Sequence, residues 1–181
     1  MQTKIWRSTY CLSIIILASM AVSGATKVEP TATITVGQFP SGVAYDSAKK
    51  EIFVSNLGDG TVSVISDATM SVIKTINVGK YPRGLAYDPA KGELFVSNSG
   101  DGTVSVLSDE TNTVVATVKV GDNPFGPVYD PAKGEIYVPN FNSHSVSVIS
   151  DATNEVIDRD LRCNSQCGKG LCDIRQDKYR N

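Results

Sequence analysis

A 42-residue period constrains the fold of this chain more than any other feature. The pair Val-Gly recurs at positions 36, 78 and 120, and the pair Tyr-Asp recurs at positions 45, 87 and 129. Residues 36–77 and 78–119 match at 26 of 42 positions without a gap, and a third copy begins at Val120. A fixed period of this length indicates that one structural unit has been duplicated in tandem.

Each copy is predicted to contain four short strands joined by tight turns. In the second copy the expected strands cover residues 84–87, 93–98, 103–108 and 113–120. The third of these alternates polar and apolar side chains, which is typical of a strand with two different faces. The Asp-Gly pair before it is a strong hairpin signal, and a Pro and a Gly mark the preceding loop. The repeats show no helical period.

This pattern predicts an all-β fold built from β-propeller blades. Four antiparallel strands in a repeat of about 40 residues are typical of such a blade. A single sheet of this kind cannot bury both of its faces, so neighbouring sheets must stack on it. We therefore expect three four-stranded blades over residues 31–158. Because propellers have about four to eight blades, three would make an incomplete or open propeller.

The repeated residues resemble those of a known family. The segments at 53–56, 95–98 and 137–140 read Phe-Val-Ser-Asn, Phe-Val-Ser-Asn and Tyr-Val-Pro-Asn, which are similar to a Tyr-Val-Thr-Asn (YVTN) signature. The chain thus resembles the YVTN-type β-propeller repeat family of surface-layer-like archaeal proteins and secreted bacterial proteins, over residues 31 to about 158. The resemblance implies a propeller in an extracellular or cell-surface setting and implies no reaction. Pro139 departs from the pattern and removes a backbone donor, which predicts a weaker central strand.

The repeat loses its pattern after Ile157. The next residues should read Thr-Ile-x-Val-Gly, but Asp160 and Arg162 occupy apolar strand positions, and residues 159–181 match nothing in the repeat. Three explanations remain open: a truncated or frameshifted gene, two chains that together form a six-bladed ring, or a short open array with a special C-terminal segment. Residues 31–36, before the first blade, are predicted to form a strand that in a closed propeller would complete the last blade.

Residues 1–25 are interpreted as a secretory signal peptide. Lys4 and Arg7 precede a 12-residue apolar stretch at 11–22, and small residues follow it. A spanning helix needs about 20 apolar residues, so we expect cleavage after Ala25 and no stable membrane span afterwards. Cleavage after Ser23 and an uncleaved anchor are the alternatives. The interpretation predicts a secreted or cell-surface protein.

The charge balance argues against nucleic acid as a partner. The formal net charge is −2, and the 17 Lys and Arg residues form no cluster. One His leaves little material for His-based catalysis or metal binding. We expect no cofactor and no metal ion.

The C-terminal tail contains three candidate disulfide cysteines, Cys163, Cys167 and Cys172. In an exported protein, cysteines this close most readily form one disulfide, with three possible pairings and one remaining thiol. The spacing lacks the paired C-x2-C of structural zinc sites, and a metal site would need a fourth ligand. A tail translated out of frame would give these cysteines no function.

His144 and the recurring Asp residues are interpreted as turn residues. The sequence specifies no nucleophile or orienting acid near His144, which a catalytic base would need. Five Asp residues recur at equivalent places in the blades, where their side chains can bond the backbone of tight turns. These are Asp59, Asp67, Asp101, Asp109 and Asp151.

The candidates for a contact surface are the positions that vary while the frame around them repeats. They flank the entry to the first strand of each blade, and four of them suit a contact surface: Phe39, Tyr81, Arg83 and Phe125. A repeating frame with divergent loops is how repeat scaffolds present a binding surface, here for a protein or a glycan. Drift in exposed loops is the alternative.

The function predicted from the sequence is a structural or interaction role without catalysis. The alternative is a fragment of a lactonase-like or quinoprotein-like propeller enzyme. Such an enzyme needs ligands that converge from several blades. The predicted inner strands read Gly-Val-Ala-Tyr, Gly-Leu-Ala-Tyr and Gly-Pro-Val-Tyr and offer none.

Overall fold

The computed structural model describes residues 32–158 of the 181-residue chain. This part consists of strands and turns and contains no helix. The strands are β1 (Pro40–Asp46), β2 (Glu51–Asn56), β3 (Thr61–Ser66), β4 (Ser71–Asn77), β5 (Pro82–Asp88), β6 (Glu93–Asn98), β7 (Thr103–Ser108), β8 (Thr113–Lys119), β9 (Val128–Asp130), β10 (Glu135–Asn140), β11 (Ser145–Ser150) and β12 (Glu155–Asp158).

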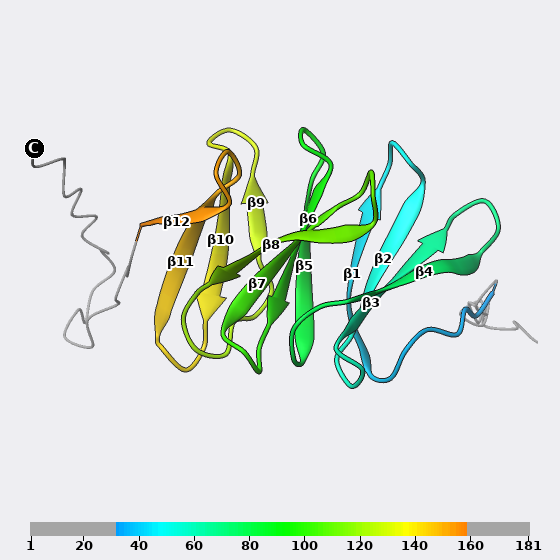
Figure 1. Cartoon of the computed structure of the whole chain (residues 1–181), viewed down its shortest axis with the longest axis horizontal. Helices are drawn as coiled ribbons and strands as arrows, with labels where there is room; N and C mark the ends of the chain where they lie inside the picture. The colour runs from blue at the N-terminus through cyan, green and yellow to red at the C-terminus, as the bar shows by residue number, and fades with distance from the viewer. Residues whose placement is uncertain (1–31, 159–181) are drawn as a thin grey trace, which may run out of the picture. The chain divides into compact units, whose positions relative to one another are not determined.

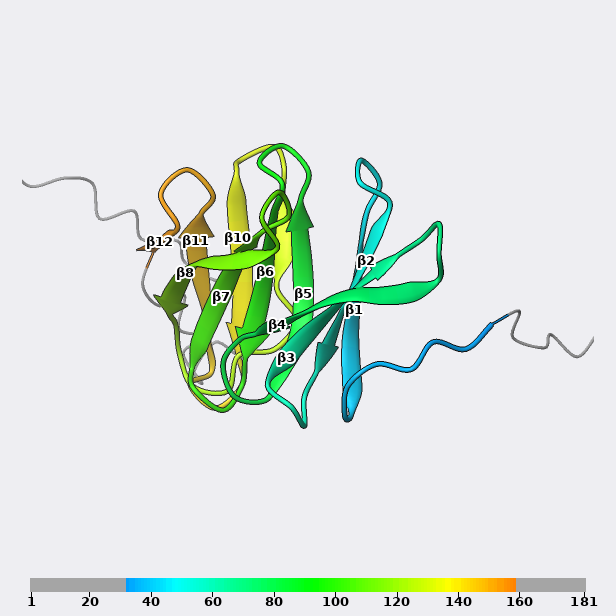
Figure 2. The same ribbon diagram turned by 45° about the vertical axis from the view of Figure 1, so that its right-hand side comes forward.

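The strands form three antiparallel sheets of four, each in sequential order. We call β1–β4 blade 1, β5–β8 blade 2 and β9–β12 blade 3. Figures 1 and 2 show the three sheets side by side, each facing the next and not joined to it edge to edge. The predicted all-β fold of three four-stranded propeller blades in an open array is therefore confirmed.

The apolar core lies between the sheets. One cluster joins blades 1 and 2, and a second joins blades 2 and 3. Because successive strand residues point to opposite faces, Phe95 and Val96 of β6 enter different clusters. Blade 2 is thus buried on both faces, whereas blades 1 and 3 each give one face to a cluster. The first cluster contains Phe53, Val62, Val64, Ile76, Leu94, Val96 and Leu107. The second contains Phe95, Val104, Val106, Val118, Ile136, Val138 and Ile149.

A buried Asn ends the second strand of each blade and fixes the chain that enters the blade. The Asn98 side chain accepts a hydrogen bond from the Gly79 N–H at 3.2 Å. Its amide nitrogen donates to the hydroxyls of Thr103 and Ser105 at 3.0 and 2.9 Å. The equivalent residues Asn56 and Asn140 bond their own blades in the same way. The last residue of the YVTN-like segment is therefore structural, because it satisfies several polar groups at once.

Pro139 shortens the neighbouring strand and not its own. β10 pairs with β11 over all six residues, but it pairs with β9 only over Glu135–Tyr137, so the predicted weakening of this central strand is found on its β9 side alone. In blade 2 the equivalent Ser97 hydroxyl accepts a hydrogen bond from the Gly84 N–H. Pro139 has no hydroxyl that could accept this bond. Blade 3 also has Pro127 at the position of Leu85, which pairs with Val96 in blade 2, and β9 has only three residues. Pro124 still pairs with Asn140, so the two prolines interrupt the inner strand between Pro124 and Val128.

The strand predicted over residues 31–36 is not formed in the described residues 32–36. For the single chain the prediction is wrong, because a strand requires a partner ladder and no strand within residues 40–158 pairs with this segment. The outer strand of blade 3 is also incomplete. β12 pairs only with Val148–Ser150 of β11, whereas β4 and β8 pair along the whole of β3 and β7.

The predicted signal peptide at 1–25 and the cysteines of the predicted tail at 159–181 lie outside the described residues. Between residues 32 and 158, no helix is long and apolar enough to cross a membrane. Both predictions therefore stay predictions.

Replacing Asn98 with Ala should lower the free energy of unfolding by about 3 kcal/mol, because the Gly79 N–H loses its acceptor and two hydroxyls lose their donor. Urea unfolding followed by circular dichroism measures this change. Asn77→Ala, at the exposed end of β4, is the matched control and should change stability by less than about 0.5 kcal/mol. Equal effects of the two variants would contradict a structural role for Asn98.

Candidate functional site

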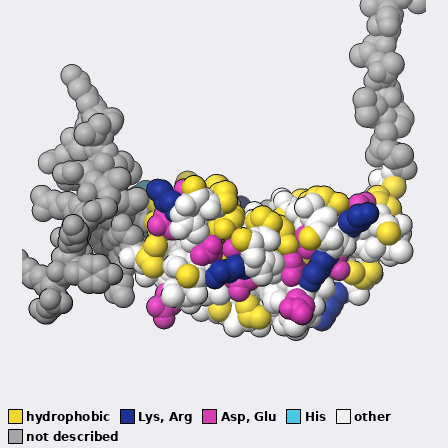
Figure 3. Space-filling model, turned by 90° about the horizontal axis from the view of Figure 1, so that it is seen from above, with side chains coloured by type: hydrophobic (Ala, Val, Ile, Leu, Met, Phe, Trp, Pro, Cys, Tyr) yellow, Lys and Arg dark blue, Asp and Glu magenta, His cyan; other side chains and the backbone are white. Residues whose placement is uncertain are grey.

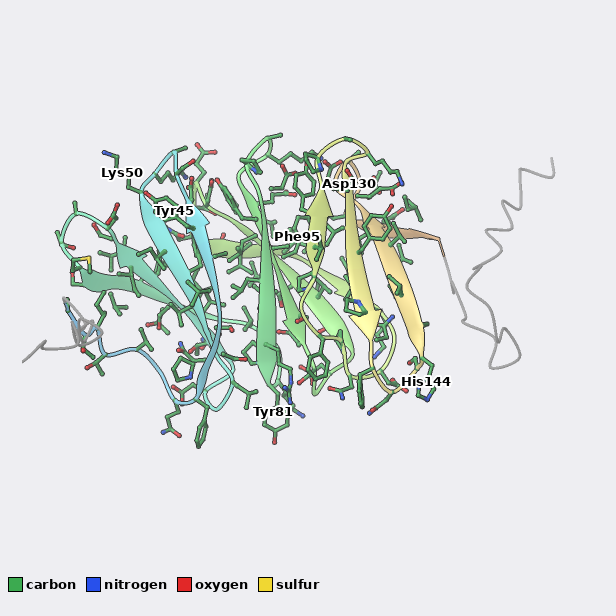
Figure 4. All side chains as sticks on the ribbon, turned by 180° about the vertical axis from the view of Figure 1, so that it is seen from behind. Tyr45, Lys50, Tyr81, Phe95, Asp130 and His144 are labelled. Carbon is green, nitrogen blue, oxygen red and sulfur yellow. The ribbon has the colours of Figure 1, made fainter. Side chains whose placement is uncertain are left out.

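One edge of the blades carries the segments that vary between repeats. We call it the loop edge and define it by residues 37–41, 79–83 and 121–125 with the turns at 57–60, 99–102 and 141–144. Figure 4 places Tyr81 and His144 at this edge and places Tyr45, Lys50 and Asp130 at the opposite one. The loop edge is therefore where divergent side chains can meet.

In each blade, one residue of the entering segment at the loop edge has a positive φ that directs its side chain outward. Tyr81 has a φ of 52°, in the left-handed region that non-glycine residues seldom adopt. The Lys80 N–H donates to the Asp101 carboxylate at 2.6 Å, which holds this conformation. The Tyr81 ring then lies over Gly100, where a Cβ would come within 2.6 Å of the ring. Tyr81 remains 56% exposed, so its ring is available for contact.

Arg83 and Phe125 connect blades 2 and 3 at the loop edge. The Arg83 Nε donates to the Ser99 hydroxyl at 3.2 Å, and the guanidinium carbon lies 4.5 Å from the centre of the Phe125 ring. Phe125 in turn packs against Phe141, with ring centres 5.7 Å apart. A cation over an aromatic face is stabilising, and the arrangement leaves Arg83 fixed and only partly buried.

Two adjoining pockets surround this pair. The first, of about 620 Å³, is lined by Tyr81 and Arg83 together with polar side chains of blades 2 and 3, namely Asp101, Asp122, Asn123 and Asn142. The second, of about 260 Å³, is mainly apolar, and Phe125, Pro139, Phe141 and His144 line it. The loop edge thus offers one polar and one apolar pocket beside each other.

The structure brings together three of the four residues predicted to form a contact surface, Tyr81, Arg83 and Phe125. Phe39 lies apart from them on blade 1, where its ring covers Gly58 and is 71% exposed. Sequence reasoning missed Phe141, although it stands where the other blades have Leu57 and Ser99 and is therefore another divergent position.

The recurring Asp residues have structural roles, but they bond other segments and not the backbone of their own turns, so this part of the prediction is wrong. Asp59 and Asp101 accept backbone N–H groups of the entering segments. Asp67, Asp109 and Asp151 accept hydrogen bonds from the tyrosine hydroxyls of their own blades.

His144 is an exposed turn residue with a φ of 51°. Within residues 32–158, no three His, Cys, Asp or Glu side chains gather in a way that could hold a metal ion.

The opposite edge holds neighbouring blades together through charge. Lys49 of blade 1 forms a 2.9 Å ion pair with Asp109 of blade 2, and Tyr87 donates to the same carboxylate at 2.7 Å. Viewed from this edge, acidic and basic side chains lie interspersed (Figure 3). Burial raises the pKa of the Tyr129 hydroxyl to about 12, and the carboxylates of Asp88 and Asp151 add to this effect.

Comparisons with known proteins identify the fold and no family. No protein-family model and no curated protein matches the chain. Hydrazine synthase of Kuenenia stuttgartiensis is similar in structure, with 23% identity and a TM-score of 0.63 over 72% of this chain and 38% of the other. The β-propeller domain of Myceliophteria thermophila Cps50 (Swd1) is also similar, with 16% identity and a TM-score of 0.58 over 66% and 36% of the two chains.

The chain therefore spans less than two fifths of the length of either protein. At these identities the likeness supports a propeller fold and says nothing of activity. The resemblance to YVTN repeats rests on the repeat residues alone.

Alkaline pH should destabilise the protein between pH 10 and about 12. The unfolded chain releases the Tyr129 proton near pH 10, and the folded chain holds it until about pH 12. This contribution to stability is complete below pH 10 and is lost as the pH rises through 12. Urea unfolding at several pH values should show a shallower decline for Tyr129→Phe than for the unaltered chain, and equal declines would refute the assignment.

Proposed function

We propose that the chain is an extracellular or cell-surface propeller-repeat protein of the YVTN type, with a structural or interaction role and no catalysis. The observation that carries the proposal is the rigid group of Arg83, Phe125 and Tyr81 beside the polar pocket of the loop edge. Its ligand is a protein or a cell-surface glycan.

The composition of the loop edge favours recognition. Arg and aromatic side chains dominate the binding energy of protein interfaces, because they bring large area and oriented donors at little loss of freedom. Arg83 is held on both sides, by Ser99 and by Phe125, so a ligand would not need to order it. The amides of Asn123 and Asn142 add hydrogen-bonding groups to the same pocket.

The setting is inferred from the sequence. The basic start and apolar stretch within residues 1–25 suit an exported chain, and the formal net charge of −2 disfavours nucleic acid as a partner. The YVTN-like repeats are consistent with the same setting.

A propeller enzyme remains the second candidate function, because one of the structurally similar proteins is named hydrazine synthase. Against it, the inner strands β1, β5 and β9 read PSGVAYD, PRGLAYD and VYD, and the one Asp of each strand accepts a backbone N–H of the following turn through one of its oxygens. Elemental analysis of the purified chain separates the two functions. The scaffold proposal expects less than stoichiometric metal, and one bound ion per chain would contradict it.

Arg83→Ala should weaken ligand binding at least about tenfold, because it removes a fixed donor and exposes the Phe125 ring. Binding is measured on arrays of immobilised glycans and of cell-surface proteins. Lys80→Ala is the matched control, because Lys80 is an exposed basic residue near the pocket that does not line it. The proposal fails if no array component binds the unaltered chain, or if both variants bind as it does.

A further inference from the structure

The two outer faces of the array carry side chains that the middle blade buries. Val43 and Tyr45 of blade 1 are 67% and 50% exposed, whereas their equivalents Leu85 and Tyr87 pack against the first core cluster. At the other end, Val128 of blade 3 is 64% exposed, and its equivalent Ala86 is 8% exposed. Each outer face is thus one half of an interface that the chain already builds twice.

Gly126 gives the most direct sign that blade 3 has an interface position without a partner among the described residues. The inner segments of neighbouring blades approach closely at Gly42 and at Gly84. A Cβ on Gly42 would come within 2.3 Å of the Arg83 carbonyl oxygen, and a Cβ on Gly84 would come within 2.2 Å of the Gly126 Cα. A Cβ on Gly126 would meet nothing within 4 Å among residues 32–158. The glycine therefore stands at a contact position whose partner strand is missing.

The incomplete edge of blade 3 has a matching segment at the other end of the repeats. In blade 1, Val62 of β3 pairs with Ile76 of β4, but the equivalent Val146 of β11 has no β12 partner among the described residues. Residues 33–37 read Thr-Ile-Thr-Val-Gly, which is the sequence missing after copy three, and 32–36 form no strand. Ile34 beside Val146 would continue the ladder in the register of the other blades.

The lysine contacts at the opposite edge also repeat from one blade to the next and, within the described residues, stop at blade 3. Lys49 of blade 1 pairs with Asp109 of blade 2, and Lys91 of blade 2 donates to the backbone oxygen of Asp151 in blade 3. Each lysine thus reaches the residue 60 positions ahead. Lys133 of blade 3 contacts only the Tyr137 hydroxyl of its own blade in the described chain. By the 42-residue period, its counterpart is Asp67 of a blade 1.

We propose that two copies of this chain associate head to tail, with blade 3 of each stacked on blade 1 of the other, to close a six-bladed ring. Residues 33–36 of one copy complete the outer strand of the other copy's blade 3. Gly126 then faces Gly42, and Lys133 faces Asp67. Two chains give a blade number inside the range of about four to eight that propellers adopt, and three chains would exceed it. A head-to-tail contact of this kind closes only if the rotation per blade permits.

Gly126→Val tests this contact without harming the single chain, because the added side chain has open space there. Analytical ultracentrifugation of the full chain, under reducing conditions and over a range of concentrations, should show a dimer. The dimer dissociation constant of the variant should rise at least about 100-fold, and at a concentration where both chains are monomeric its melting temperature should equal that of the unaltered chain. Gly84→Val is the contrast, because it clashes inside the chain and should lower the melting temperature itself.

A charge exchange identifies the partner face. Lys133→Asp should raise the dimer dissociation constant about tenfold, and adding Asp67→Lys to the same chain should restore it. Lys80→Asp, away from both faces, should change nothing.

The proposal is overturned if the unaltered chain is a monomer, which is also the result expected if its own termini cover these faces. A polymer that grows with concentration, or a dimer that Gly126→Val leaves intact, overturns it equally. These outcomes are independent of ligand binding at the loop edge.

Discussion

The whole structure depends on the stacking of one sheet's apolar face on the next sheet. Phe53 and Phe95 are almost fully buried, and each lies between two blades and not within one. Burying a side chain of this size contributes about 1.5–3 kcal/mol. A four-stranded sheet has a second face that its own residues cannot cover, so its neighbours are part of its stability. This explains why the sequence repeats the same alternation in every copy.

Stacking also separates the residues that build the frame from the residues that can vary. The frame needs the buried Asn that holds each entering segment and the glycines where inner strands approach. The side chains at positions 81, 83 and 125 are not part of these frame contacts, and they differ between blades that share one fold. The candidate contact surface arises where the loops of blades 2 and 3 meet on a rigid support.

Much of the fold could be predicted from the sequence, because the period and the alternation of residues both act locally. The strand predicted at 93–98 is β6, and that at 103–108 is β7. The cation over the Phe125 ring could not be predicted, since it joins residues 42 positions apart whose side chains vary between copies. The strand predicted over 31–36 failed for a related reason, because a strand forms only beside a partner. The short β9 was not predicted, because it depends on Pro127 and Pro139 together and only Pro139 lies in the repeat signature.

Hydrogen exchange of backbone amides, resolved by residue, tests most directly whether stacking carries the stability. Under conditions where the chain is mostly monomeric, amides of β6 and β7 in the doubly covered blade should exchange slowest. Those of β2, β3, β10 and β11 should exchange faster by at least about tenfold, because each of their sheets has one face covered by a neighbouring blade within residues 32–158, whereas blade 2 has two. Equal protection in the three sheets would show that each blade is stable by itself and would contradict the account.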